Sequence, residues 1–144
     1  MPELNPVWKN KVEIGTALSS STWTYSELAE GIESMTPNFT ELNQVYHFLK
    51  DQGFAHNEVT GAEPAFQVSG RRVVGDTAQD YIVGKQFALG PDRNSSVRIT
   101  AEGKVLTCPC TLTDIIGFGG NSTEVNQFGV TIRLNGEPTL TDAQ

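Results

Sequence analysis

An alternating stretch near the C-terminal end decides the fold, Phe128-Gly129-Val130-Thr131-Ile132-Arg133-Leu134-Asn135-Gly136. Its large apolar side chains fall on every second position, which is the period of a β-strand that buries one face. The Asn-Gly pair that follows favours a tight two-residue hairpin turn. The sequence therefore predicts a half-buried strand over residues 128–134 and a hairpin turn at Asn135-Gly136.

Four earlier segments show the same period of two. Their alternating apolar positions are Val12 and Ile14, Phe66 and Val68, Val97 and Ile99, and Leu106, Cys108, Cys110 and Leu112. Residues 101–104 contain Glu102-Gly103 and can turn the chain between two of these strands. The pattern predicts a mainly β chain, an antiparallel β-sandwich or barrel. It places both cysteines in the core, where we expect reduced thiols because Cys108-Pro109-Cys110 is too short for an unstrained disulfide.

One flanking α-helix is expected over about residues 77–88, from Thr77 to Ala88. Asp76 can cap its start, with Gln79 three residues further on as in a capping box. Gly90-Pro91 ends the helical pattern.

Residues 40–52 fit two different structures. Leu42, Val45 and Leu49 fall at helical spacing behind Thr40, which can act as a cap. The same segment also fits an extended strand with aromatic side chains among polar neighbours. Periodicity alone favours the helix.

Length and composition indicate one globular domain over residues 1–144. Hydrophobic residues make up 38% of the chain and charged residues 19%, which is typical of a protein that folds in water. No stretch approaches the roughly 20 apolar residues that span a bilayer, and no apolar signal sequence follows Met1. The formal net charge of −7 argues against a nucleic-acid-binding protein with a basic face.

No motif indicates an enzyme, a metal site or a cofactor site. The acidic residues Glu58, Glu63, Asp76 and Asp80 could serve glycoside hydrolysis only at a separation that the sequence does not set. The cysteines have no Cys or His partners at zinc-binding spacing. We therefore predict no enzymatic activity, no metal and no cofactor.

The arginines and tryptophans have structural and functional interpretations. Arg71, Arg72, Arg93 and Arg98 could form a basic patch, but in an acidic chain we expect them to pair with carboxylates. Trp8 and Trp23 could stack on a sugar or a base, although isolated tryptophans more often anchor a core or an interface.

Three segments in order along the chain resemble one protein family. They are residues 59–82, VTGAEPAFQVSGRRVVGDTAQDYI, residues 28–38, LAEGIESMTPN, and residues 128–138, FGVTIRLNGEP. Together they resemble the major tail tube proteins of long-tailed phages of Gram-positive bacteria.

The resemblance implies a structural virion protein made in the bacterial host's cytoplasm. It implies hexameric rings that stack into a hollow tube, which conducts phage DNA from the capsid without binding it specifically. The implied partners are further copies of the chain, a tape measure protein and tail terminator or tip proteins, with no membrane.

The resemblance also implies that residues 40–52 are extended and lead into a projecting arm. We therefore expect residues 40–57 to be an assembly arm whose interface residues are Tyr46, Phe48, Leu49 and Phe54. Residues 141–144 are expected to be a loose tail. Two alternatives remain: the inner tube of a phage-derived contractile particle, and a carbohydrate-binding or capsid decoration module.

Overall fold

The computed structural model describes residues 2–142 and is mainly β. Its strands are β1 (Lys11–Ser19), β2 (Thr22–Glu27), β3 (Ile32–Pro37), β4 (Thr40–His47), β5 (Ala55–Glu63), β6 (Ala65–Arg71), β7 (Asn94–Ala101), β8 (Lys104–Ile116), β9 (Gln127–Leu134) and β10 (Thr139–Asp142). Its helical elements are α1 (Thr77–Gly84) and the short 3-10 turns η1 (Val7–Lys9), η2 (Leu49–Asp51) and η3 (Gly90–Arg93). The predicted mainly β, antiparallel fold with one α-helix is confirmed.

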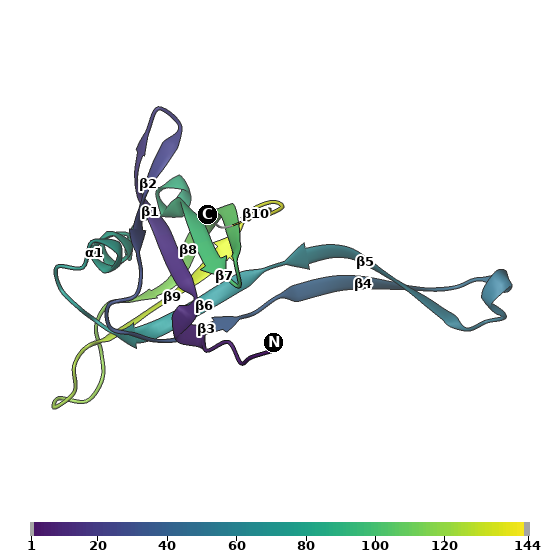
Figure 1. The fold of residues 1–144 in the computed structure, drawn as a ribbon, viewed down its shortest axis with the longest axis horizontal. Helices are drawn as coiled ribbons and strands as arrows, with labels where there is room; N and C mark the ends of the chain where they lie inside the picture. Colours follow the sequence, from purple (N-terminus) through teal and green to yellow (C-terminus); the bar gives the residue numbers. More distant parts are fainter. Residues whose placement is uncertain (1, 143–144) are drawn as a thin grey trace.

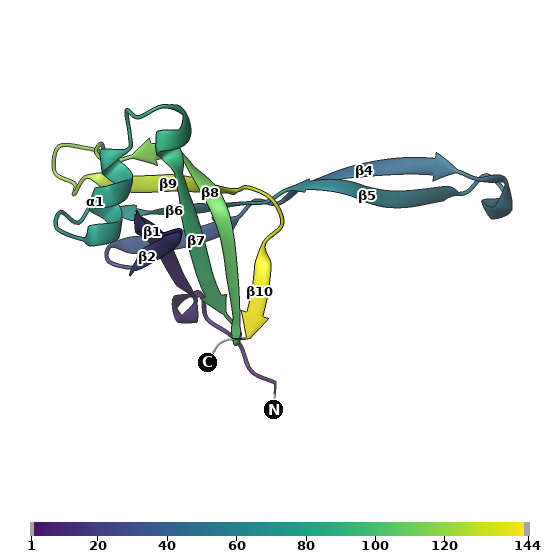
Figure 2. The same cartoon turned by 90° about the horizontal axis from the view of Figure 1, so that it is seen from above.

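Eight strands form one antiparallel sheet in the order β2-β1-β7-β8-β9-β6-β3, with β10 also paired to β8. β7 pairs with β8 from Lys104 to Thr111, and β9 and β10 share the other edge of β8. β9 pairs with residues Cys110 to Ile116 of β8, and β10 pairs with residues Lys104 to Thr107. The sheet folds over along β8, and its two halves face each other as a sandwich (Figures 1 and 2).

The core lies between the two halves and draws on nearly every strand of the sandwich. Fully buried members include Ile14, Val68, Val97, Leu112, Phe128 and Ile132. α1 covers one end of the sandwich, where it contacts β1, β2 and β8. Its Ala78 and Ile82 are fully buried in the same cluster.

Both cysteines lie in this core, as predicted. Cys108 and Cys110 are 0% exposed, and both thiols are free. Burial raises the pKa of the Cys110 thiol from its ordinary value of 9.0 to about 12. The same cause raises the pKa of Cys108, whose Sγ donates a hydrogen bond to the carbonyl of Asn135 at 3.4 Å.

The raised thiol pKa makes stability sensitive to alkaline pH. In the unfolded chain Cys110 loses its proton above about pH 9, while the folded chain keeps it to about pH 12. The contribution of this thiol to the free energy of unfolding is therefore fully present below pH 9. Each pH unit above pH 9 lowers that free energy by about 1.4 kcal/mol. Urea unfolding at pH 8 and pH 10 should show a smaller loss in Cys110→Val than in the wild type. Equal losses in the two proteins would contradict this coupling.

The helix ends earlier than predicted. α1 stops at Gly84, whereas the sequence pattern continued to Ala88. The reason is Arg93, whose guanidinium donates hydrogen bonds to the carbonyls of Gln86 and Ala88 at 2.6 and 2.9 Å. The Arg93 side chain therefore binds these carbonyls in place of further helical N–H groups. The chain then continues into η3.

Two expectations for the C-terminal end are wrong. Asn135-Gly136 does not close a two-residue hairpin on β9, because the next strand, β10, pairs with β8. The Asn135 N–H donates to the carbonyl of Pro109 at 2.8 Å, which keeps the chain on the edge of β8. Thr141 and Asp142, expected in a loose tail, are the last residues of β10. Residues 143–144 lie outside the described residues.

Candidate assembly surface

The arm is a separate two-stranded sheet of β4 and β5 that projects from the sandwich (Figures 1 and 2). Its base is closed by reciprocal backbone hydrogen bonds between Asn38 and Ala65, at 2.7 and 3.2 Å. The extended interpretation of this segment is therefore confirmed, and the helical one is wrong. The arm also continues beyond residue 57 to Glu63.

Cross-strand pairing explains why the helical periodicity failed. Tyr46 pairs with His56 and Val45 pairs with Asn57 in the antiparallel ladder, so the backbone hydrogen bonds go to the partner strand. Only residues Leu49–Asp51 take a helical turn, as η2 at the tip. His47 Nδ1 lies 2.9 Å from the carbonyl oxygen of Gly53 and ties the two sides of this turn together.

The tip of the arm carries the four residues predicted for the interface. Tyr46, Phe48, Leu49 and Phe54 are 42%, 47%, 99% and 76% exposed, and we call them the apolar knob. Tyr46 and Phe48 stack with ring centroids 5.6 Å apart, and Phe48 lies 5.5 Å from the ring of His56. The rings thus support one another, while their outer surfaces remain open to solvent.

Four further apolar side chains of this region are exposed, although none of them was predicted as an interface residue. Phe39, Leu42, Val45 and Val59 are each more than half exposed. Phe39 stands at the base of the arm and makes an edge-to-face contact with Phe66 of the sandwich, with ring centroids 5.2 Å apart. Interpreting residues 39–45 and 55–63 as two strands of the arm would have identified these side chains as part of its surface. So many exposed apolar side chains on one thin ribbon are typical of a surface that another molecule covers.

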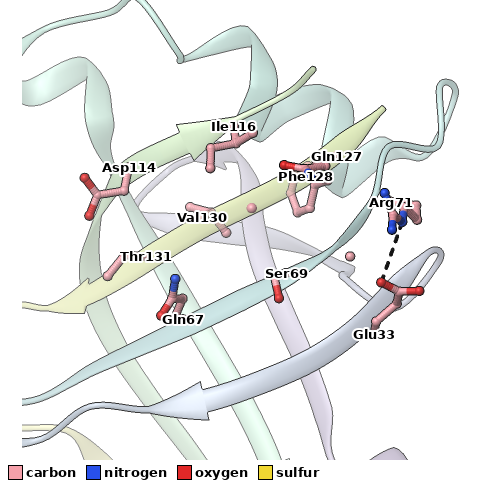
Figure 3. Close-up of a pocket in the computed structure, with 12 residues that line it drawn as sticks. Glu33, Gln67, Ser69, Arg71, Asp114, Ile116, Gln127, Phe128, Val130 and Thr131 are labelled. Atoms are coloured by element: carbon pink, nitrogen blue, oxygen red, sulfur yellow. Dashed lines mark ion pairs between the residues drawn. The ribbon is translucent and has the colours of Figure 1, made fainter. Parts of the chain in front are cut away.

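A second surface feature is a polar groove of about 360 Å³ on the outer face of β3, β6, β9 and the end of β8 (Figure 3). The ion pair Arg71–Glu33, at 3.7 Å, lies at one end, and Gln67 and Thr131 lie between strands near the other. Arg133 and Asp114 form a second pair on this face, also at 3.7 Å. The charges on this face are thus balanced in pairs.

The other arginines are also held within the fold. Arg72 pairs with Asp80 at 2.7 Å and Arg98 with Glu13 at 2.9 Å, as predicted. Hydrogen bonds from these guanidiniums lower the pKa of both carboxyl groups. Arg93 differs, because it donates to backbone carbonyls, including that of Leu112 at 3.1 Å.

The carboxylates considered for catalysis are not brought together. Glu58 and Glu63 lie on β5 of the arm, whereas Asp76 and Asp80 lie at the start of α1 (Figure 1). Among residues 2–142, no group of three His, Cys, Asp or Glu side chains could hold a metal ion.

The two tryptophans do not form a platform together. Trp23 is half-buried and packs against Gly15, where an added Cβ would lie 2.7 Å from the indole ring. Trp8 is 79% exposed on η1.

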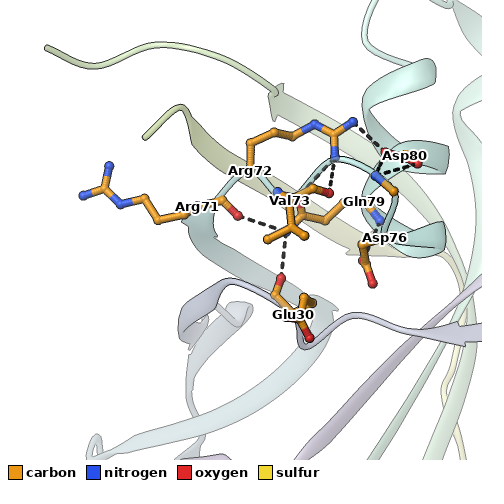
Figure 4. Close-up of polar contacts among 8 residues, drawn as sticks. Glu30, Arg71, Arg72, Val73, Asp76, Gln79 and Asp80 are labelled. Carbon is orange, nitrogen blue, oxygen red and sulfur yellow. Dashed lines mark hydrogen bonds and ion pairs between the residues drawn. The ribbon is translucent and has the colours of Figure 1, made fainter. Parts of the chain in front are cut away.

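The predicted helix cap is present, but Gln79 has a larger role than the sequence indicated (Figure 4). Asp76 Oδ2 accepts a hydrogen bond from the backbone N–H of Gln79 at 3.1 Å. The Gln79 side chain does not complete a capping box. Its amide nitrogen donates to the carbonyls of Glu30 and Arg71, at 2.8 and 3.0 Å, and its oxygen accepts from the N–H of Val73 at 2.8 Å.

Gln79 thereby joins α1 to two other stretches of backbone, the turn at Glu30 and residues 71–73. It is 0% exposed, and the guanidinium of Arg72 adds a further hydrogen bond to its oxygen at 3.3 Å. Glu30 lies in the turn before β3, and Arg71 ends β6. This side chain therefore holds α1 against the start of β3 and the end of β6, which are the ends of these strands away from the arm (Figure 4).

The whole arrangement, a folded-over antiparallel sandwich with a helix at one end and a projecting arm, is the fold of chains found in phage-like tails. It matches a chain in the tail of an empty gene transfer agent particle, determined with helical refinement and C6 symmetry, with a TM-score of 0.76. That match covers 96% of this chain and 99% of the other, at 12% identity. A chain in the virion of a native gene transfer agent particle matches with a TM-score of 0.70, over the same shares and at the same 12% identity.

These matches show the fold. No family model and no curated protein matches the sequence. Within residues 2–142, no helix has the length and apolar character needed to cross a membrane.

Proposed function

We propose that the protein is a structural tail tube subunit, without enzymatic activity or a cofactor, that forms stacked hexameric rings around a channel for DNA. The observation that carries this proposal is the match to a chain from a C6-symmetric tail, which extends over 96% of this chain. Coverage of that extent includes most of the arm as well as the sandwich. The exposed apolar knob supports the same role, because it needs a partner that the single chain does not supply.

Ring closure also gives a use to the edges of the sheet. β2 and β3 are the end strands in the sheet order, so each leaves one row of backbone groups without a strand partner among residues 2–142. Exposed edges promote uncontrolled strand pairing in a monomer, whereas neighbours in a closed ring can cover them. We place the contacts between neighbours within a ring at these edges.

The charge of the chain suits a channel for DNA. The formal net charge is −7, and the arginines described above are held by carboxylates or backbone carbonyls. Acidic residues outnumber basic ones by 17 to 10, so a channel wall with this balance would repel the phosphates of DNA and bind it weakly. DNA would therefore pass without specific binding, while the tape measure and the terminator or tip proteins would contact the inside and the ends of the tube.

The particle can be a phage tail or a phage-derived tail. The two structures described above come from gene transfer agent particles, which supports including a phage-derived tail. The location in either case is the tail of a particle assembled in a bacterial cell.

Electron microscopy of the purified protein tests this function. Negative-stain images over rising protein concentration are expected to show rings and then hollow tubes, with six subunits in averaged end views. A protein that stays monomeric at every concentration, and is also absent from tubes of its own particle, would overturn the proposal. A monomer that binds oligosaccharides on a glycan array would point instead to a carbohydrate-binding module.

A further inference from the structure

An apolar groove of about 420 Å³ opens at the base of the arm. Its lining includes Met35, Phe39, Phe66, Ile99, Leu106 and Leu140. These residues come from β3, the start of the arm, β6, β7, β8 and β10, so the groove lies where the two halves of the sandwich separate. Phe66 and Ile99 also belong to the core, whereas Phe39 and Leu140 are 55% and 66% exposed at the surface. The groove is thus an open side of the hydrophobic core.

We propose that this groove receives the apolar knob of a second copy of the chain, an inference that rests on the proposed tube function and adds the docking site of the arm. The knob is convex and apolar, with Leu49 at 99% and Phe54 at 76% exposure. The groove is concave and apolar. The knob and the groove can therefore each bury the exposed apolar surface of the other.

The knob cannot enter the groove of its own chain. Phe39 lines the groove, and the extended chain from Phe39 to Leu49 carries the tip about 30 Å away. Both views show the arm leading straight away from the sandwich (Figures 1 and 2). A second copy displaced by about one arm length along this direction brings its groove to the knob.

The direction of the contact fits a stack rather than a closed dimer. Each copy uses its knob once and its groove once, and the two surfaces are different. Such a head-to-tail contact leaves a free knob at one end and a free groove at the other, so it repeats without closing. The length of the arm then sets the spacing between successive rings.

Other exposed apolar side chains make a poorer docking site. Val74, Phe87, Leu89 and Phe118 are each more than 60% exposed, but they lie in the connections around α1 and after β8. None of them lines the apolar groove. Phe118 is therefore a suitable control position for a contact outside the groove.

Cross-linking between two singly substituted proteins tests the docking. One protein carries Leu49→Cys in the knob, the other carries Leu140→Cys at the rim of the groove, and the two are mixed before assembly. The native Cys108 and Cys110 give little background, because both are fully buried. A short bismaleimide is expected to join the two proteins in tubes and not in dilute monomer. Leu49→Cys mixed with Phe118→Cys is the matched control and should give no cross-link.

The outcomes separate this inference from the proposed function. Tubes with the 49–140 cross-link support the docking. Tubes that lack it, or that show the 49–118 cross-link instead, overturn the docking and leave the tube function standing. Wild-type protein that stays monomeric at every concentration, and is also absent from the tubes of its own particle, overturns the function and the docking with it. If the wild type assembles but the substituted pair does not, a second pair replaces it, Phe54→Cys in the knob with Val7→Cys on the groove. A cross-link in this second pair supports the docking, and its absence from tubes overturns the docking.

A charge in the groove provides an independent measurement. Leu140→Asp is expected to raise the protein concentration needed for tube formation at least tenfold, since docking would then bury a carboxylate among apolar side chains. Glu137→Asp, outside the groove lining, is the control and should leave that concentration unchanged. An unchanged threshold in Leu140→Asp would count against the docking.

Discussion

A subunit whose residues 41–62 are replaced by an Asn-Gly turn is expected to fold as a soluble monomer and to form no tubes. Thr40 and Glu63 are paired in the ladder, so a tight turn can join them directly. The reciprocal hydrogen bonds between Asn38 and Ala65 hold the base in register. The removed segment contributes nothing to the buried core, so circular dichroism and the midpoint of thermal unfolding should change little.

Complete loss of assembly is expected because the arm carries the apolar surface that has no partner within the chain. Sedimentation and electron microscopy at concentrations where the wild type forms tubes provide the measurement. The double variant Leu49→Asp, Phe54→Asp should reproduce the loss with the arm intact. Lys50→Ala, in the same turn, should assemble normally. Normal tubes from the shortened protein would show that the arm is not the stacking element.

Replacing Gln79 by leucine is expected to cause the largest loss of stability from one substitution. The side chain is fully buried and bonds the backbone of Glu30, Arg71 and Val73. Leucine has a similar size but leaves these groups without partners inside the protein. Each unsatisfied buried group costs about 1–3 kcal/mol, so the three groups together give an expected loss of roughly 3–9 kcal/mol. Urea unfolding would show a lower midpoint with an unchanged slope.

Two further variants separate the buried network from the helix cap. Asp76→Ala removes only the cap and should cost about 1 kcal/mol. Gln79→Glu at neutral pH keeps the acceptor for Val73 but loses both donated hydrogen bonds, so it should also be strongly destabilised. If Gln79→Leu costs no more than Asp76→Ala, the network contributes little.

Five strands of the sandwich, β1, β6, β7, β8 and β9, could be predicted because their determinant is local. Val130 and Ile132, like Cys108 and Cys110, point inward because alternate side chains of any strand share one face. The start of α1 was predicted for a similar reason, since the spacing from Asp76 to Gln79 places a carboxylate at the first free N–H groups. The resemblance to tail tube proteins added the extended arm, which periodicity alone did not favour.

The amino-acid sequence by itself determined the five strands with an alternating pattern, the start of the helix and the inward-facing side chains of those strands, since these depend on neighbours a few residues apart. Only the tertiary structure decided the arm ladder, the seating of β10 on β8 and the partners of Gln79. Glu30 is 49 residues from Gln79 in the sequence, and no local pattern reports a contact of that range. The apolar groove joins side chains from β3, β6, β7, β8 and β10. Such a surface exists only once these distant strands are packed, because its shape is set by their positions in space and not by the order of their residues.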